Sequence, residues 1–104
     1  MKNITDKEVK ETIANSSKLL IIDLWANWCG PCRSLGPKLE ELNKENSDST
    51  EIVKLDVDEN PETPAQYHVR GIPTILFFKD GQLVDTLVGN QPKETLQAAI
   101  DKHK

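Results

Sequence analysis

The sequence predicts an α/β fold in which a central mixed sheet of four to five strands carries about four helices on its two faces. Strand-forming runs alternate with segments of helical periodicity, as in parallel strands joined by helical crossovers. The run Lys18 to Ala26 is apolar almost throughout, which is typical of a strand covered on both faces. Two further runs flank Asp80-Gly81, a two-residue hairpin signal, so this pair must be antiparallel.

Length and charge restrict the function classes. A chain of 104 residues is expected to form one domain, 1–104, with its own core. Its 17 Asp and Glu against 13 Lys and Arg give a net charge of -4, which argues against nucleic acid as a partner. No run is long and apolar enough to cross a bilayer, and the N-terminus lacks the apolar segment of a secretory signal. We expect a cytoplasmic monomer that is not inserted in a membrane.

The first elements follow from local patterns. Thr5-Asp6-Lys7-Glu8 forms a capping box, and Ile4 with Val9 fits a hydrophobic staple, so a helix is expected from Asp6 to Asn15. The apolar run from Lys18 to Ala26 follows as a strand.

A second helix, starting near Cys32, is predicted by the spacing of its leucines. Pro37 lacks a backbone donor, so this helix must bend at Gly36-Pro37 or begin anew there, and we favour a bend. A further strand is expected over 52–57, and a short helix through Tyr67 has two alternative starts, at Pro61 or at Pro64.

The chain closes with two strands and a helix. The runs Thr74 to Phe78 and Leu83 to Val88 are the strands of the predicted hairpin. Gln91-Pro92 then starts a helix with three inward positions, Leu96, Ala99 and Ile100.

The only two cysteines, Cys29 and Cys32, lie where the central strand ends and a helix begins. Unpaired N–H groups at a helix start favour a thiolate, which makes Cys29 the candidate nucleophile. Cys32 lies about one turn further on and can attack a mixed disulfide at Cys29 as the resolving thiol. Pro31 suits the first helical turn, and Gly30 leaves the backbone open to a partner. Together these residues predict thiol–disulfide exchange.

A metal site is the alternative use of a cysteine pair. Zinc would need two further ligands, and the two histidines, His68 and His103, are not at ligand spacing from the cysteines. We therefore expect no metal and no bound cofactor.

Asp23 is the one charged residue inside the apolar run, and burial should raise its pKa. It can then take the proton from Cys32 when that thiol must attack, through water. The alternative is a structural aspartate bonded to Lys54 on the neighbouring strand, and both roles are compatible. Of the nearby tryptophans, Trp25 is expected in the core and Trp28 on a contact surface.

The segment from Asp23 to Arg33, with Trp28-Cys29-Gly30-Pro31-Cys32 at its centre, closely resembles the active-site segment of thioredoxins. Gly36-Pro37, Lys54 to Asp58, Gly71 to Thr74 and Val88-Gly89 extend the likeness over nearly the whole chain. The resemblance implies the thioredoxin fold, with Asp23 and Lys54 as the family's buried pair. The segment before Thr5 is short, so the first strand of that fold is expected to be frayed or missing.

The resemblance also implies features around the site. A residue before proline ordinarily takes a trans bond, yet the likeness implies a cis bond before Pro73. It further implies a shallow apolar groove for extended protein segments, lined by Trp28, Gly71, Ile72, Pro73, Val88 and Gly89. The implied activity is the reduction of disulfides in substrate proteins, with the dithiol regenerated by an NADPH-dependent flavoprotein, thioredoxin reductase.

Two other functions remain compatible with this fold. An oxidase or isomerase would need a more oxidising pair, whereas Gly30-Pro31 between the cysteines resembles the reducing members. A binding subunit would use the fold as a rigid partner and would not need the cysteines.

Overall fold

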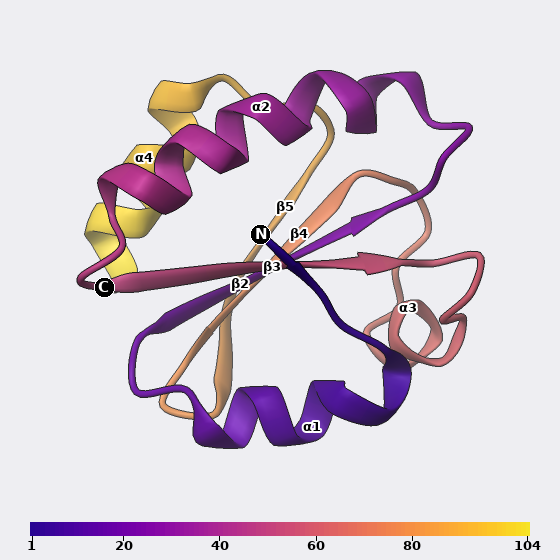
Figure 1. Cartoon of the computed structure of the whole chain (residues 1–104), viewed down its shortest axis with the longest axis horizontal. Helices are drawn as coiled ribbons and strands as arrows, with labels where there is room; N and C mark the ends of the chain where they lie inside the picture. Colours follow the sequence, from indigo (N-terminus) through magenta and orange to yellow (C-terminus); the bar gives the residue numbers. More distant parts are fainter.

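The computed structural model describes all residues, 1–104, as a five-stranded mixed sheet between two layers of helices. Helices α1 and α3 cover one face of the sheet, and α2 and α4 cover the other (Figure 1). The strand order is β1-β3-β2-β4-β5. The elements are β1 (Lys2–Asn3), α1 (Asp6–Asn15), β2 (Leu19–Trp25), α2 (Gly30–Glu45), β3 (Thr50–Asp56), α3 (Glu62–Gln66), β4 (Thr74–Lys79), β5 (Gln82–Val88) and α4 (Lys93–His103).

Strand β2 is the centre of the sheet, as its apolar sequence predicts. It pairs in parallel with β3 and antiparallel with β4. Its side chains alternate between two cores. Leu19 and Ile21 pack with the leucines of α2 and the inner face of α4, whereas Leu20, Ile22 and Leu24 pack on the side of α1.

Helix α1 begins as its sequence predicts. The carboxylate of Glu8 accepts hydrogen bonds from the backbone N–H of Thr5 at 2.9 Å and from the Thr5 hydroxyl at 3.1 Å. Ile4 and Val9 are both buried in the same core cluster, as a hydrophobic staple requires. Local residues therefore supply the capping box of α1.

The structure decides between the alternatives left by the prolines and locates the hairpin. Helix α2 continues through Pro37 and does not begin anew there. Pro61 is the N-cap of α3, so the earlier of its two possible starts is correct. Asp80 and Gly81 have φ angles of 52° and 80°, the left-handed backbone that a tight hairpin between β4 and β5 requires.

Along the outer edge of β3, several backbone groups are already hydrogen-bonded to other parts of the chain. A first strand is present, although its two residues pair only with Val53 and Lys54 of β3. Further along β3, the backbone N–H of Thr50 donates to the carbonyl of Asn46 at 2.8 Å. The N–H of Ile52 donates to Oδ1 of Asn43 at 3.2 Å.

None of the helices combines the length and the apolar character that a membrane span requires.

Candidate active site

The two cysteines lie at the start of α2, where the carboxyl end of β2 delivers the chain. Cys29 is the N-cap of α2, and its Sγ is bonded to that of Cys32, with the two Cα atoms 5.3 Å apart. The backbone N–H of Cys32 points at the Cys29 sulfur, at 3.1 Å. Pro31 lies in the first turn, and no acidic residue is present there. The helix start therefore offers positive charge to Cys29 and no competing carboxylate.

The surroundings of the pair are mostly apolar. Cys29 and Cys32 are only 3% and 5% exposed and cluster with the buried Ala26. Trp28 is 68% exposed, and its Nε1 donates to Asp58 Oδ2 at 3.0 Å. Trp25 is partly buried against the cysteine cluster. The expectation for Trp28 is therefore confirmed, whereas Trp25 lies at the margin of the core and not inside it.

Asp23 is 2% exposed, and desolvation raises its pKa to about 7, against an opposing attraction from Lys54. Its Oδ1 has no hydrogen-bond partner. Lys54 is opposite Asp23 in the register of β2 and β3, but its Nζ lies over the ring of Trp25, 4.8 Å from the centroid. The expected aspartate–lysine bond is therefore not formed, because the ammonium faces an aromatic ring instead.

Asp23 and Cys32 share one cavity. The space of about 240 Å³ is lined by both residues together with Lys54, Arg33 and Gly36. A volume of this size can hold water molecules. Asp23 and the second cysteine are thus connected by a hydratable space, although they belong to different elements.

The Pro73 loop approaches the cysteines through Ile72, which packs against the cysteine cluster. The Ile72–Pro73 bond is cis, so the expectation from the resemblance is confirmed and the ordinary trans preference is wrong here. The Pro73 carbonyl accepts from the N–H of Gly89 at 2.8 Å, and the Thr74 hydroxyl donates to the carbonyl of Gly71 at 2.5 Å. These bonds tie the Pro73 loop to the start of β4 and to the residue that follows β5.

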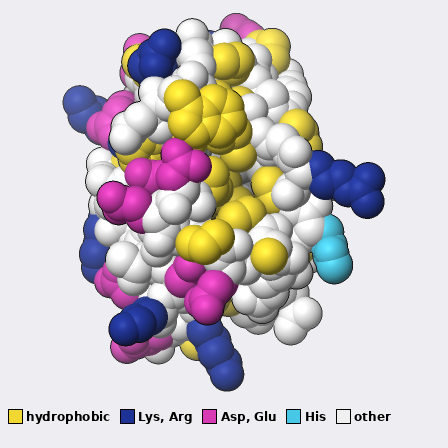
Figure 2. All heavy atoms as spheres, turned by 90° about the vertical axis from the view of Figure 1, so that its right-hand side faces the viewer, with side chains coloured by type: hydrophobic (Ala, Val, Ile, Leu, Met, Phe, Trp, Pro, Cys, Tyr) yellow, Lys and Arg dark blue, Asp and Glu magenta, His cyan; other side chains and the backbone are white.

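An apolar hollow of about 430 Å³ opens beside the cysteines. It is lined by Trp28, Val57, Pro61, Pro64, Ala65, Val69, Arg70, Gly71 and Ile72. Figure 2 shows the face at the carboxyl ends of β2 and β3, where hydrophobic side chains form a band with acidic groups on one side. Three of the residues expected in the groove, Trp28, Gly71 and Ile72, line this hollow.

The remaining expected groove residues are not among those that line the hollow. Gly89 is linked to Pro73 by its backbone bond, and Val88 is 59% exposed. Sequence reasoning missed the wall supplied by α3, whose only signal is the pair of prolines Pro61, at the N-cap of this short helix, and Pro64, inside it.

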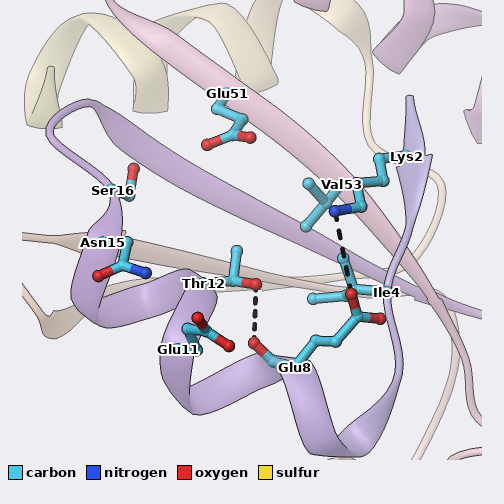
Figure 3. Close-up of a pocket in the computed structure, with 9 residues that line it drawn as sticks. All are labelled: Lys2, Ile4, Glu8, Glu11, Thr12, Asn15, Ser16, Glu51 and Val53. Atoms are coloured by element: carbon cyan, nitrogen blue, oxygen red, sulfur yellow. Dashed lines mark hydrogen bonds and ion pairs between the residues drawn. The ribbon is translucent and has the colours of Figure 1, made fainter.

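A larger hollow, about 480 Å³, lies far from the cysteines, between α1 and the outer side of β3. Figure 3 shows its polar lining, in which Lys2 pairs with Glu8 at 3.9 Å and the Thr12 hydroxyl donates to the Glu8 carbonyl at 2.7 Å. It is lined by no cysteine, and neither of the two unpartnered buried side-chain atoms lies in it. Nor does any group of three or more His, Cys, Asp or Glu side chains converge as metal ligands would. The chemistry is therefore concentrated at the start of α2.

Comparisons with known proteins agree with this geometry. Residues 1–102 match the family model described as Thioredoxin. The chain is 48% identical over 103 residues to a protein named Thioredoxin from Listeria monocytogenes, covering 99% of this chain and 98% of the relative. It is 50% identical over 100 residues to Thioredoxin from Staphylococcus haemolyticus and 47% over 100 residues to Thioredoxin 1 from Synechococcus elongatus, each covering 96% of this chain and 94% of the relative. This chain belongs to the thioredoxin family, and it is a thiol–disulfide oxidoreductase that reduces protein disulfides through Cys29 and Cys32.

Proposed function

We propose that Cys29 is the attacking thiolate and Cys32 the resolving thiol. The observation that carries this assignment is the place of Cys29 at the N-cap of α2, where the N–H of Cys32 points at its sulfur at 3.1 Å. Such donors and the helix dipole stabilise a thiolate at Cys29 more than one inside the first turn. Exposure does not separate the two thiols, because both are nearly buried.

The reaction transfers two electrons to the substrate disulfide. The Cys29 thiolate attacks one substrate sulfur, so that a mixed disulfide forms and the other substrate sulfur leaves as a thiolate that takes up a proton. The Cys32 thiolate then attacks Cys29. The Cys29–Cys32 disulfide forms, and the second substrate sulfur leaves. The enzyme pair is oxidised, and the substrate is reduced to a dithiol.

Asp23 receives the proton that Cys32 must lose before it attacks. Its pKa of about 7 gives it a substantial ionised fraction at neutral pH, and its free Oδ1 can accept. The shared cavity offers a water path between the two groups. Lys54 lies in the same cavity and favours the ionised form of Asp23 by its charge.

Substrate proteins bind as extended segments across the apolar face. The hollow beside Trp28, Gly71 and Ile72 takes apolar side chains, and the exposed backbone of Gly30 and Pro31 permits close approach. Backbone groups near Pro73 pair with the substrate segment. Two residues, Val88 and Gly89, bound its other side.

Electrons reach the protein from outside. The chain carries no cofactor of its own in this proposal, and an NADPH-dependent thioredoxin reductase regenerates the dithiol. The protein acts as a monomer in the cytoplasm, where reducing conditions keep a cysteine pair available.

The test is reduction of insulin by dithiothreitol with the purified protein as catalyst. The wild type should accelerate precipitation of the insulin chains, and Cys29→Ser should return it to the uncatalysed rate. Ala98→Ser, an exposed substitution on α4, is the control for folding and handling. Equal rates for wild type and Cys29→Ser would overturn the assignment of Cys29. A redox potential more oxidising than the glutathione couple would favour an oxidase.

A further inference from the structure

One wall of the apolar hollow is a helix too short to be stable alone. Helix α3 has five residues, and Pro61, Pro64 and Ala65 at this helix face the hollow opposite Ile72. Isolated helices of this length do not persist in water, because nucleation costs more than the few hydrogen bonds return. The wall is therefore held by contacts from elsewhere in the fold.

The start of α3 is held by a residue from α1. Oδ2 of Asp6 accepts from the backbone N–H of Glu62 at 3.0 Å. Oδ1 of Asp6 accepts from the N–H of Thr63 at 2.9 Å and from its hydroxyl at 2.6 Å. These N–H groups have no partner within α3, as in the first turn of any helix, and Thr63 is almost fully buried. A carboxylate distant in sequence thus acts as the cap of α3.

The contact is reciprocal. The N–H of Asp6, in the first turn of α1, donates to Oδ1 of Asn60 at 2.8 Å. Nδ2 of Asn60 donates to the carbonyl of Asp56 at 3.1 Å, at the end of β3. The starts of α1 and α3 therefore fix one another, and the network ends on the sheet. The other end of α3 is fixed separately, where Tyr67 packs edge-on against Phe78 at 5.5 Å.

We propose that Asp6 is a positioning residue for the capture of protein substrates, because it keeps the α3 wall of the hollow in its binding conformation. The inference rests on the proposed function, in which the hollow receives a segment of the substrate. Without Asp6, two N–H groups of α3 lose their acceptor, and a substrate must order the wall as it binds. A small disulfide reaches Cys29 without using the wall and is not affected.

The test compares a protein disulfide with a small one in single-turnover reactions of the dithiol protein. Tryptophan fluorescence follows oxidation by excess insulin, and absorbance follows reaction with 5,5′-dithiobis(2-nitrobenzoate). Asp6→Ala should raise the half-saturating insulin concentration about fivefold while its limiting rate stays within about twofold. The rate with the small disulfide should not change. Asp6→Asn retains an acceptor oxygen and should recover most of the insulin affinity.

Glu8→Ala is the matched control, because it weakens the start of α1 without contacting α3. At a comparable loss of thermal stability, it should leave both substrates unaffected. Thr63→Val removes only the hydroxyl contact and should shift insulin binding in the same direction by less, which tests the proposal even if Asp6→Ala does not fold. An unchanged half-saturating insulin concentration in both Asp6→Ala and Thr63→Val, or equal changes for insulin and the small disulfide, would overturn the role of Asp6. Failure of the proposed function would instead appear in the wild type, as insulin reduction that does not need Cys29.

Discussion

The starts of α1 and α2 both carry the positive end of a helix dipole, but different groups lie beside it. At α1 a carboxylate occupies the helix start, and hydrogen bonds from the backbone and side chain of Thr5 lower the pKa of Glu8. At α2 the cap is the sulfur of Cys29, and no acidic side chain lies in the first turn. The nearest buried carboxylate, Asp23, has its pKa raised to about 7 by desolvation. A helix start that stabilises the fold is neutralised locally, whereas one that performs chemistry is left available for a thiolate.

The largest expected effect comes from removing the second sulfur at the α2 start. Cys32→Ser keeps the attack by Cys29 but cannot resolve the mixed disulfide, so insulin turnover should stop. A covalent adduct with insulin should accumulate and should be visible on a non-reducing gel. Ser34→Ala, an exposed change two residues after Cys32, should form no lasting adduct. Continued turnover without an adduct would mean that Cys32 has no resolving role.

The second effect concerns Asp23, the buried carboxyl group that shares a cavity with Cys32 of α2. Because the pKa of Asp23 is about 7 in the folded protein, this group retains a proton between about pH 4 and 7 that the unfolded chain releases. Stability should therefore fall as pH rises through that window. Asp23→Asn should raise the free energy of unfolding by about 2–4 kcal/mol at pH 8 and by little at pH 4. Urea unfolding at the two pH values measures this difference.

The same variant also tests the proton transfer. Asp23→Asn should slow release of the mixed disulfide, and the wild-type rise of this rate with pH near 7 should disappear. Asp48→Asn, an exposed change, is the control for both measurements. A stability gain without any change in the release step would show that Asp23 is only a buried charge.

The third prediction tests the contrast between the two helix starts directly, by placing an acidic residue in the first turn of α2, as in α1. A Cβ at Gly30 meets no atom within 4 Å, so Gly30→Asp fits without displacing the backbone. The added carboxylate should disfavour the Cys29 thiolate and slow its alkylation by iodoacetamide at pH 7 about three- to tenfold. Gly30→Asn is the isosteric neutral control. Equal alkylation rates in the two variants would mean that charge at this helix start does not control the thiolate.

The smallest effect is expected at α1. Glu8→Ala should lower the midpoint of thermal unfolding by about 2–5 °C at neutral pH and leave insulin reduction unchanged. Because the pKa of Glu8 is lowered by folding, its contribution is present above its ordinary value of 4.5 and is lost as pH falls. Glu11→Ala, on the same helix without a capping bond, is the control. In strong acid Glu8 is protonated, so a midpoint difference between Glu8→Ala and the wild type that persists there would contradict an ionic cap.

Local patterns were sufficient to predict most of the fold. The capping residues of α1, the apolar run of β2 and the turn at Asp80-Gly81 each act over a few neighbours, so their elements lie within one or two residues of the expected bounds. The start of α3 stayed open because Pro61 and Pro64 both suit a first helical turn. The position of the cysteines followed from the strand and the helix on either side of them.

Features that depend on distant contacts could not be predicted in this way. Local preference favours a trans bond before Pro73, and only the family resemblance implied the cis bond. Register places Lys54 opposite Asp23, but the direction of its ammonium depends on the ring of Trp25. The contact of Asp6 with the start of α3 joins residues more than fifty positions apart, and no local pattern marks it.

The closed side of β3 has a consequence for a protein that handles disordered chains. An open strand edge is a template on which extended polypeptides can assemble, and substrates with reduced disulfides expose many such segments. Here the N–H groups of Thr50 and Ile52 are already occupied by Asn46 and Asn43. A released substrate segment therefore cannot pair with these backbone N–H groups of β3. Co-aggregation through this edge of the sheet is disfavoured.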